Sequence, residues 1–277
     1  MIDFETILTL AQKELRDARR NRWFVLYAIA FATLSLALAW LALSGAGNFG
    51  LAGFGRTAAS MINLVLLIVP LMGLTLGALS LTGERERGTW LYLLAQPIDQ
   101  TELLLGKFLG LALALIAALG LGFGLTGVLI AFNGRGGAPD VYITLLLLTC
   151  LVALASLSIG FLVATIARRS AAALGMALFV WLALVLLGDL GLMGTALILK
   201  LDVGQLFGLA LINPLQLFRL AAILGLRQDL DVLGPVGIYA LRQYGANLRW
   251  LLTGLLILWI IAPLLATAWA GRRRGAL

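Results

Sequence analysis

Long stretches without a single charged residue constrain the fold of this chain more than any other feature. Five of them exceed 20 residues, and a sixth, shorter one, 170–188, ends directly before Asp189; the five are 23–55, 57–83, 108–134, 141–167 and 250–271. About 20 apolar residues in a helix cross the hydrocarbon core of a bilayer. Hydrophobic residues make up 62% of the chain and charged residues only 12%, unlike soluble proteins. The sequence therefore predicts an all-α polytopic membrane protein with six transmembrane helices.

The basic residues predict which side of the membrane each loop occupies, because cytoplasmic loops carry an excess of Lys and Arg. With a cytoplasmic N-terminus, thirteen of the 20 basic residues fall on the cytoplasmic side, at positions 13, 16, 19, 20, 22, 85, 87, 107, 168, 169 and 272–274. We therefore expect one transmembrane domain over residues 1–277, with both termini cytoplasmic. The net charge of +7 then reflects topology, and we expect no nucleic-acid partner.

Residues 1–22 precede the first apolar stretch and carry a helical pattern of their own. Apolar side chains recur at helical spacing, with charged side chains around the rest of the helix. The apolar set is Phe4, Ile7, Leu8, Ala11, Leu15 and Ala18. This pattern predicts an amphipathic helix in the membrane interface, with a solvated basic tail as the alternative. The first apolar stretch exceeds the roughly 7–15 residues of the apolar core of a signal peptide, so we expect it to stay as a membrane anchor.

The connection over residues 83–107 is longer than a simple reversal of direction requires. It begins with charges that alternate in sign and continues through an apolar run that Pro97 interrupts; the opening residues are Gly83, Glu84, Arg85, Glu86, Arg87, Gly88 and Thr89. Such a pattern favours two short helices parallel to the membrane with an exposed charged side. We interpret the segment as a docking surface for a cytoplasmic partner, with a plain solvated turn as the alternative.

A second long connection, residues 189–249, is external in this topology. Its uncharged run over 203–218 is short for a span and is broken by the turn signal Asn213-Pro214. Non-helical backbone survives at membrane depth only where protein or a water-filled cavity buries it. We therefore expect a re-entrant or interfacial hairpin between spans five and six; a seventh span would place Arg272 to Arg274 outside. Candidate contacts for an external partner are Asn213, Pro214 and Arg219.

The motifs of enzymes and of nucleotide-binding proteins are absent from the sequence. There is no histidine and a single cysteine, Cys150, so we expect neither a metal site nor catalytic residues. A phosphate-binding loop is missing because the only Gly-Lys pair, at 106–107, is followed by Phe108. We therefore expect no cofactor in this chain and an energy source in a partner. Asp189 could contact a substrate at the outer mouth of span five, or simply mark the end of that span.

The motif Glu84-Arg85-Glu86-x-Gly88-Thr89 resembles the signature of ABC-2 type permeases, the membrane subunits of ABC exporters. The resemblance also includes Leu93, Pro97 and Lys107, and it extends over the whole chain. It implies an N-terminal elbow helix, a coupling segment between spans two and three, and a re-entrant external segment. It further implies that a separate cytoplasmic ATPase binds ATP and Mg²⁺. The residues that would couple to this ATPase are Glu84, Arg85, Glu86, Arg87, Gly88, Thr89 and Pro97.

Residues 11–23 and 210–214, with Phe218-Arg219, are similar to a narrower group, the NosY-type permeases of nitrous oxide reductase maturation. This likeness implies a homodimer in the bacterial inner membrane with two copies of a NosF-type ATPase. It also implies a periplasmic β-helix protein of the NosD type, with a copper-chaperone lipoprotein as a further partner. The implied cargo is a sulfur species for the copper–sulfide centre, since one cysteine and no histidine make a poor copper path. Export of a drug, lipid or polysaccharide, or force transmission without transport, are the alternatives.

Overall fold

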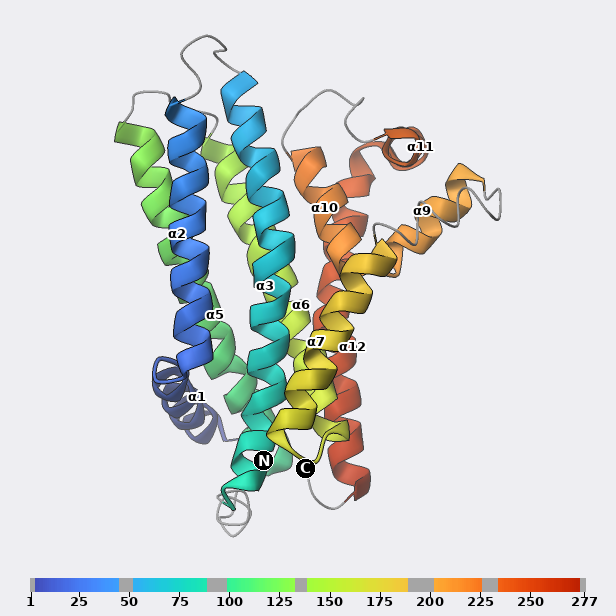
Figure 1. The fold of residues 1–277 in the computed structure, drawn as a ribbon. Coiled ribbons are helices and arrows are strands. Elements are labelled where there is room, and N and C mark those ends of the chain that lie inside the picture. The colour runs from blue at the N-terminus through green and yellow to red at the C-terminus, as the bar shows by residue number, and fades with distance from the viewer. Residues whose placement is uncertain are drawn as a thin grey trace.

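The computed structural model describes residues 3–44, 52–88, 99–132, 139–188, 202–225 and 234–274, and these contain helices and turns but no strand. The helices are α1 (Phe4–Ala18), α2 (Arg22–Ser44), α3 (Ala52–Glu86), α5 (Gln100–Phe132), α6 (Pro139–Ile166), α7 (Ser170–Leu186), α9 (Val203–Leu211), α10 (Pro214–Gly225), α11 (Gly234–Tyr244) and α12 (Leu248–Arg274). Figure 1 shows the long helices running side by side, with α1 lying across one end of the bundle. The last turns of α12 lie at that same end, which we call the α1 end.

The predicted class, an all-α polytopic membrane protein, is confirmed. Among the described residues, α2, α3, α5, α6 and α12 each contain a stretch long and apolar enough to cross a bilayer, and the bent pair α9–α10 raises the number to six if it forms one span. The predicted fifth span corresponds to α7, which is apolar but has only 17 residues. At 1.5 Å per residue it is about 26 Å long, slightly less than the hydrocarbon core.

Helix boundaries differ from the sequence prediction on both sides of the second span. Helix α3 begins at Ala52, so that Arg56 lies within the helix instead of separating two spans. A charge ends an apolar run, but it does not end a helix. Helices α3 and α5 also extend into both ends of the predicted 83–107 segment. Its central part, 89–98, lies outside the described residues, together with Thr89, Pro97 and the two predicted short helices.

Helix α3 is central to the bundle, where it packs most extensively on α6. A Cβ atom added at Gly77 would lie 2.4 Å from the carbonyl oxygen of Leu157, and one at Gly160 would lie 2.5 Å from that of Leu74. Only glycine lets two helix backbones come so close, an arrangement typical of membrane helices. Helix α3 also packs on α2 and α7. A movement of α3 would therefore reach most of the bundle.

Helix α1 confirms the predicted amphipathic helix, but its buried face is rotated from the predicted one. The side chains that face the bundle are those of Ile7, Leu10, Ala11, Glu14 and Ala18. Phe4 and Leu8, which the periodicity assigned to the apolar face, are 75% and 60% exposed. A buried glutamate is tolerated only where its charge is compensated. The exposed Phe4 and Leu8 suit contact with the apolar part of a membrane interface.

The predicted break at Asn213-Pro214 is present, because α9 and α10 meet there at 110°. Figure 1 shows α10 against the bundle, whereas α9 projects sideways from it. Helix α11 packs on α9 and was not predicted, because the uncharged run 232–241 is too short for a span and contains no motif. Asp189 lies outside the described residues.

Candidate functional site

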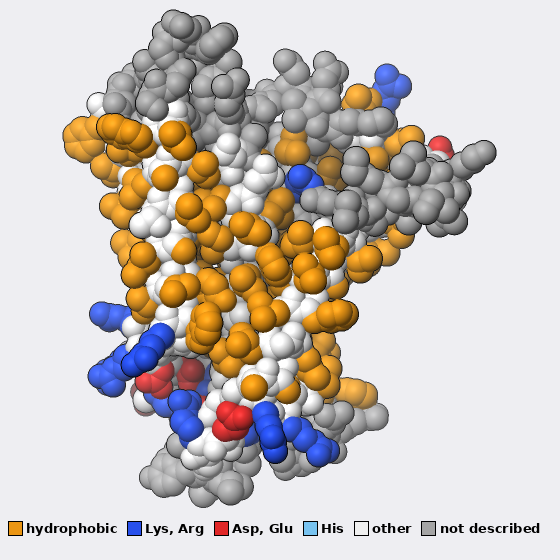
Figure 2. Space-filling view, in the orientation of Figure 1, with side chains coloured by type: hydrophobic (Ala, Val, Ile, Leu, Met, Phe, Trp, Pro, Cys, Tyr) orange, Lys and Arg blue, Asp and Glu red, His pale blue; other side chains and the backbone are white. Residues whose placement is uncertain are grey.

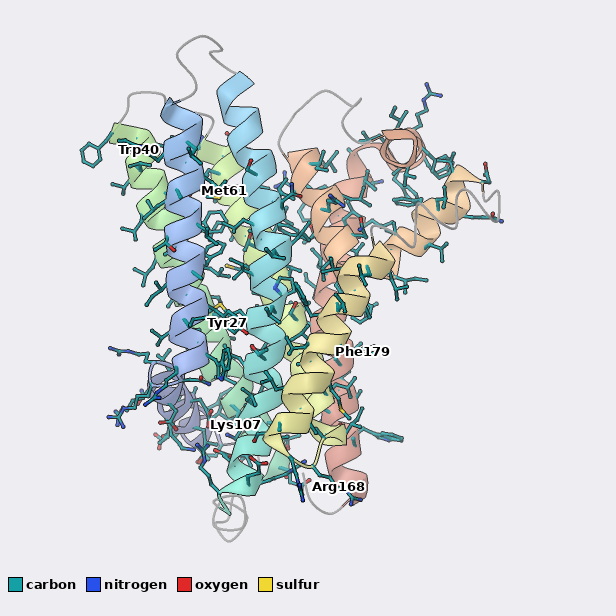
Figure 3. The ribbon with its side chains drawn as sticks, in the orientation of Figure 1. Tyr27, Trp40, Met61, Lys107, Arg168 and Phe179 are labelled. Atoms are coloured by element: carbon teal, nitrogen blue, oxygen red, sulfur yellow. The ribbon has the colours of Figure 1, made fainter. Side chains whose placement is uncertain are left out.

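The most concentrated polar site in the described part of the bundle is a group of four charged side chains at the α1 end. Lys107 of α5 is 1% exposed, and its Nζ lies 2.7 Å from the Oε1 of Glu14 and 2.7 Å from the Oε1 of Glu84. Lys13 of α1 lies 3.0 Å from Glu84 and 3.4 Å from Glu14. Figure 3 shows Lys107 among the helices at this end. We call these four residues the ion cluster.

The ion cluster joins three helices that are far apart in the sequence. Glu14 and Lys13 lie on α1, Glu84 on α3 and Lys107 on α5, so each lysine bridges two carboxylates from different helices. Burial alone would lower the pKa of Lys13, but the carboxylates of Glu84 and Glu14 outweigh this effect and raise it. Lys13 is therefore fully protonated near neutral pH.

Close packing of α1 on α5 places Glu14 within reach of Lys107. A Cβ atom at Gly106 would lie 2.6 Å from the Cβ of Leu10, and one at Gly110 would lie 2.4 Å from the carbonyl oxygen of Ala11. The two glycines flank Lys107 on the face of α5 that meets α1. A second contact holds the start of α1, where the backbone N–H of Asp3 donates to Glu102 at 2.7 Å.

Arg85 and Glu86, the next two residues of the motif, connect α3 to two further helices. Arg85 Nη1 donates to the carbonyl oxygens of Ala164 at 3.1 Å and Ala167 at 3.4 Å, at the C-terminal end of α6. Glu86 accepts the backbone N–H of Ser170, the first residue of α7, at 3.0 Å. A cation at a helix C-terminus and an anion at a helix N-terminus both complement the helix dipole.

Glu86 also takes the place of an N-cap, because Arg169 at that position makes no side-chain capping bond. Three consecutive residues, Glu84, Arg85 and Glu86, thus connect the end of α3 to four other helices. Helix α3 then ends, and Gly88 adopts the left-handed conformation with φ +72° that commonly follows a helix C-terminus.

The structure separates the predicted coupling residues into two groups. Glu84 is buried and belongs to the ion cluster, and Arg85 is half-buried against α6. Glu86, Arg87 and Gly88 are exposed at the tip of α3. The family motif included Lys107 but gave it no role, and Lys13 and Glu14 were not among the predicted coupling residues. Two features could have indicated a role, namely the place of Glu14 between Ala11 and Ala18 on the helical face and the position of Lys107 at the start of an apolar run.

The residues predicted to meet an external partner have structural contacts of their own. Asn213 Nδ2 donates to the carbonyl oxygen of Leu184 at 2.7 Å, and its Oδ1 accepts the backbone N–H of Leu215 at 2.9 Å. Asn213 therefore caps α10, with Pro214 at the first helical position that suits proline. Arg219 is half-buried in α10. Among the described residues no three His, Cys, Asp or Glu side chains are grouped to hold a metal ion.

Comparison with known proteins identifies the family of the chain. The family model described as "ABC-2 family transporter protein" matches residues 8–274. The chain is 34% identical to the "Probable ABC transporter permease protein NosY" of Pseudomonas aeruginosa, covering 97% of this chain and 98% of that protein. It is 30% identical to the protein of the same name from Stutzerimonas stutzeri, with the same coverage. The chain therefore belongs to the ABC-2 family of transporter proteins, as a multi-pass permease subunit.

Proposed function

We propose that this permease acts as a homodimer with a cytoplasmic ATPase that binds ATP and Mg²⁺, and that the tip of α3 receives the motion of the ATPase. The observation that supports this proposal most directly is the set of contacts made by Glu84, Arg85 and Glu86. A tip that only reversed the chain would not need bonds to α1, α5, α6 and α7. The exposed Glu86, Arg87 and Gly88, together with Thr89 and Pro97, form the contact with the ATPase.

In this mechanism Glu84 and Arg85 transmit the motion and Arg87 touches the partner, whereas Glu86 does both, because it is exposed and also accepts the backbone N–H of Ser170. A push on the segment after Gly88 displaces the end of α3. The ion cluster then carries α1 and α5 along, while Arg85 and Glu86 carry the ends of α6 and α7. Because interhelical bonds to charged groups are stronger than neutral ones, the end of the bundle moves as one unit.

The α1 end faces the cytoplasm in this proposal, and the protein lies in the bacterial inner membrane with both termini inside. The distribution of basic residues supports this orientation, since thirteen of the 20 belong to this side. Helices α9 and α11 then face the periplasm, where the β-helix protein of the NosD type and the copper-chaperone lipoprotein are the proposed partners.

The proposed cargo is a sulfur species needed for the copper–sulfide centre of nitrous oxide reductase. The names of the two relatives support it, and the test is complementation. We would express this chain with its ATPase in a bacterium that lacks its own NosY-type permease and record the absorption spectrum of the purified reductase. We expect the spectrum of the complete centre. A reductase without the centre, despite an assembled permease–ATPase complex, would refute the cargo but not the permease function.

Force transmission to an external partner is the second candidate, and the projecting α9 and α11 favour it. They expose Leu209, Ile212, Tyr239 and Tyr244, which are 41%, 65%, 36% and 38% accessible. Inside-out vesicles supplied with ATP and a radiolabelled sulfur donor separate the two candidates. Transport predicts ATP-dependent uptake of label, whereas force transmission predicts ATP hydrolysis with no uptake.

A further inference from the structure

One buried carboxylate at the α1 end takes no part in the ion cluster. Glu102 of α5 is 5% exposed, and no ion pair within the described residues involves it. Figure 2 shows charged side chains gathered on the surface at this end, next to the apolar band of the bundle, which is where acidic side chains usually lie. A buried carboxylate without a cation must be compensated by hydrogen bonds, so the donors to Glu102 show what it holds in place.

Glu102 accepts two backbone N–H groups, one on each oxygen. Its Oε1 lies 2.7 Å from the backbone nitrogen of Asp3, and its Oε2 lies 3.2 Å from that of Asp99. Asp3 is the N-cap of α1. Asp99 directly precedes α5, and its carbonyl oxygen accepts the N–H of Leu103 as an N-cap residue does. One carboxylate therefore binds the first residues of two helices, and its charge complements both helix dipoles.

The two hydrogen bonds of Glu102 differ in kind. A glutamate three residues after an N-cap commonly closes that cap, so the bond to Asp99 is local to α5. The bond to Asp3 is not part of this motif, and it crosses 99 positions of the chain. The cap of α5 would form equally well with the second oxygen in water. The burial of Glu102 and its second bond therefore serve to fix the start of α1 to the start of α5.

These two helix starts meet where the α3–α5 connection, residues 87–99, rejoins the bundle. The connection leaves the bundle at the end of α3, where Glu84 binds Lys13 of α1. It returns at the start of α5, where Glu102 binds Asp3 of α1. Lys13 and Asp3 are ten positions apart, about 15 Å along a helix. Helix α1 is thus bonded beside both ends of the connection.

We propose that Glu102 is a positioning residue for coupling, because it holds α1 to the point where the α3–α5 connection re-enters the bundle. Motion received by the connection then reaches α1 at both ends, through Glu84 and through Glu102. Without the bond to Asp3, a push at the return point would be absorbed by the first turn of α5, since the first four N–H groups of a helix have no partner within it. The inference rests on the proposed coupling to an ATPase, but on neither the cargo nor the orientation in the membrane.

The test replaces Glu102 by glutamine in the full-length permease purified with its ATPase. Glu102→Gln keeps the size of the side chain but has one acceptor oxygen, so it holds only one of the two N–H groups. Glu5→Gln is the matched control, because Glu5 is an exposed glutamate in the first turn of α1. Hydrogen–deuterium exchange with mass spectrometry measures residues 4–14 with and without Mg²⁺ and a non-hydrolysable ATP analogue.

A second pair of variants tests the same bond and leaves the cap of α5 in place. Asp3→Pro removes the N–H that Glu102 accepts, because proline has none. Asp3→Ala is its control, since it also loses the capping side chain of Asp3 but keeps the backbone N–H. This pair decides the question if Glu102→Gln does not fold.

In the wild type, Glu5→Gln and Asp3→Ala, we expect the ATP analogue to change the exchange of residues 4–14. In Glu102→Gln and Asp3→Pro, we expect this ATP-dependent difference to be lost although the ATPase still co-purifies. Without nucleotide, exchange at the start of α1 should be at least about tenfold faster in Glu102→Gln, because a hydrogen bond to a charged group is missing.

A purely structural role of Glu102 predicts faster exchange with the ATP-dependent difference intact, and that result would overturn the proposal. Loss of the ATPase from Glu102→Gln would overturn it as well, since the residue would then serve assembly instead of coupling. So would a wild-type response to the ATP analogue that is confined to α3 and absent from residues 4–14. A wild type that purifies without an ATPase, or that shows no ATP-dependent difference in any helix, would instead refute the proposed function and this inference together.

Discussion

Replacing the buried Lys107 by methionine should destabilise the protein more than replacing any exposed charged residue. Its Nζ lies 2.7 Å from each of two carboxylates. At an effective dielectric constant of about 20, each contact corresponds to about 6 kcal/mol of Coulomb attraction before desolvation. Removing one member of such a buried set costs about 3–5 kcal/mol, because the other charges stay buried without their partner. For comparison, the free energy of unfolding of a whole soluble domain is only about 5–15 kcal/mol.

Two matched variants show where this energy comes from. Lys13→Met removes the same charge from the same cluster, but Lys13 is 45% exposed, and we expect a loss of at most about 1 kcal/mol. The triple variant Lys107→Met with Glu14→Gln and Glu84→Gln removes the charges that Lys107 neutralises. Since it leaves no uncompensated buried carboxylate, we expect it to be more stable than Lys107→Met alone.

The assay is unfolding by SDS in mixed micelles, followed through the fluorescence of the seven tryptophans. The free energy of unfolding is compared among wild type, Lys107→Met, Lys13→Met and the triple variant. Equal small losses in the two lysine variants would refute the reasoning. A triple variant less stable than Lys107→Met would refute it as well, since the cost would then come from lost packing instead of unpaired charge.

Three further outcomes test other parts of the structure. Gly110→Ala should push α1 off α5 and lower the free energy of unfolding in SDS by about 1–3 kcal/mol, because the added Cβ would lie 2.4 Å from a backbone oxygen. Gly120→Ala is the control, and it should cause no measurable loss because Gly120 has open space around it. Asn213→Ala should lose the cap of α10 and cost about 0.5–2 kcal/mol in the same assay, and an unchanged value would contradict the capping role. The pKa of Lys13 is raised above its ordinary value of 10.5, so its contribution to stability should be complete at lower pH and disappear as the pH rises through the raised pKa. A free energy of unfolding that already declines between about pH 7 and pH 9 in the wild type, but not in Lys13→Met, would contradict this direction of the pH dependence.

The membrane helices and the break at Asn213-Pro214 were predictable because their signals are local. An uncharged run predicts a span wherever it packs, and an Asn-Pro pair interrupts a helix by its own chemistry. The exact ends were not predictable, as Arg56 illustrates, because a helix continues past the charge that ends its apolar run. Helix α11 lacked any such local signal and was missed.

The candidate site was only partly predictable, because its contacts join residues that lie far apart in the chain. The motif located Glu84, but Glu84 pairs with Lys13 and Lys107, which are 71 and 23 positions away. Nothing within one helix tells a lysine at the end of a span whether it will meet water or two carboxylates. The glycines at 106 and 110 allow that meeting, and in a chain with 32 glycines their spacing alone carried little information.

The most direct test of the coupling role is purification of the tagged permease in mild detergent, with mass spectrometry of the proteins that come with it. Wild type is compared with Glu86→Lys, which reverses a charge at the exposed tip of α3, and with Glu5→Lys, which reverses an exposed charge on α1. We predict that an ABC ATPase accompanies wild type and Glu5→Lys and is lost with Glu86→Lys. If the wild type purifies without any ATPase, or if Glu86→Lys retains it fully, the tip of α3 is not the coupling site.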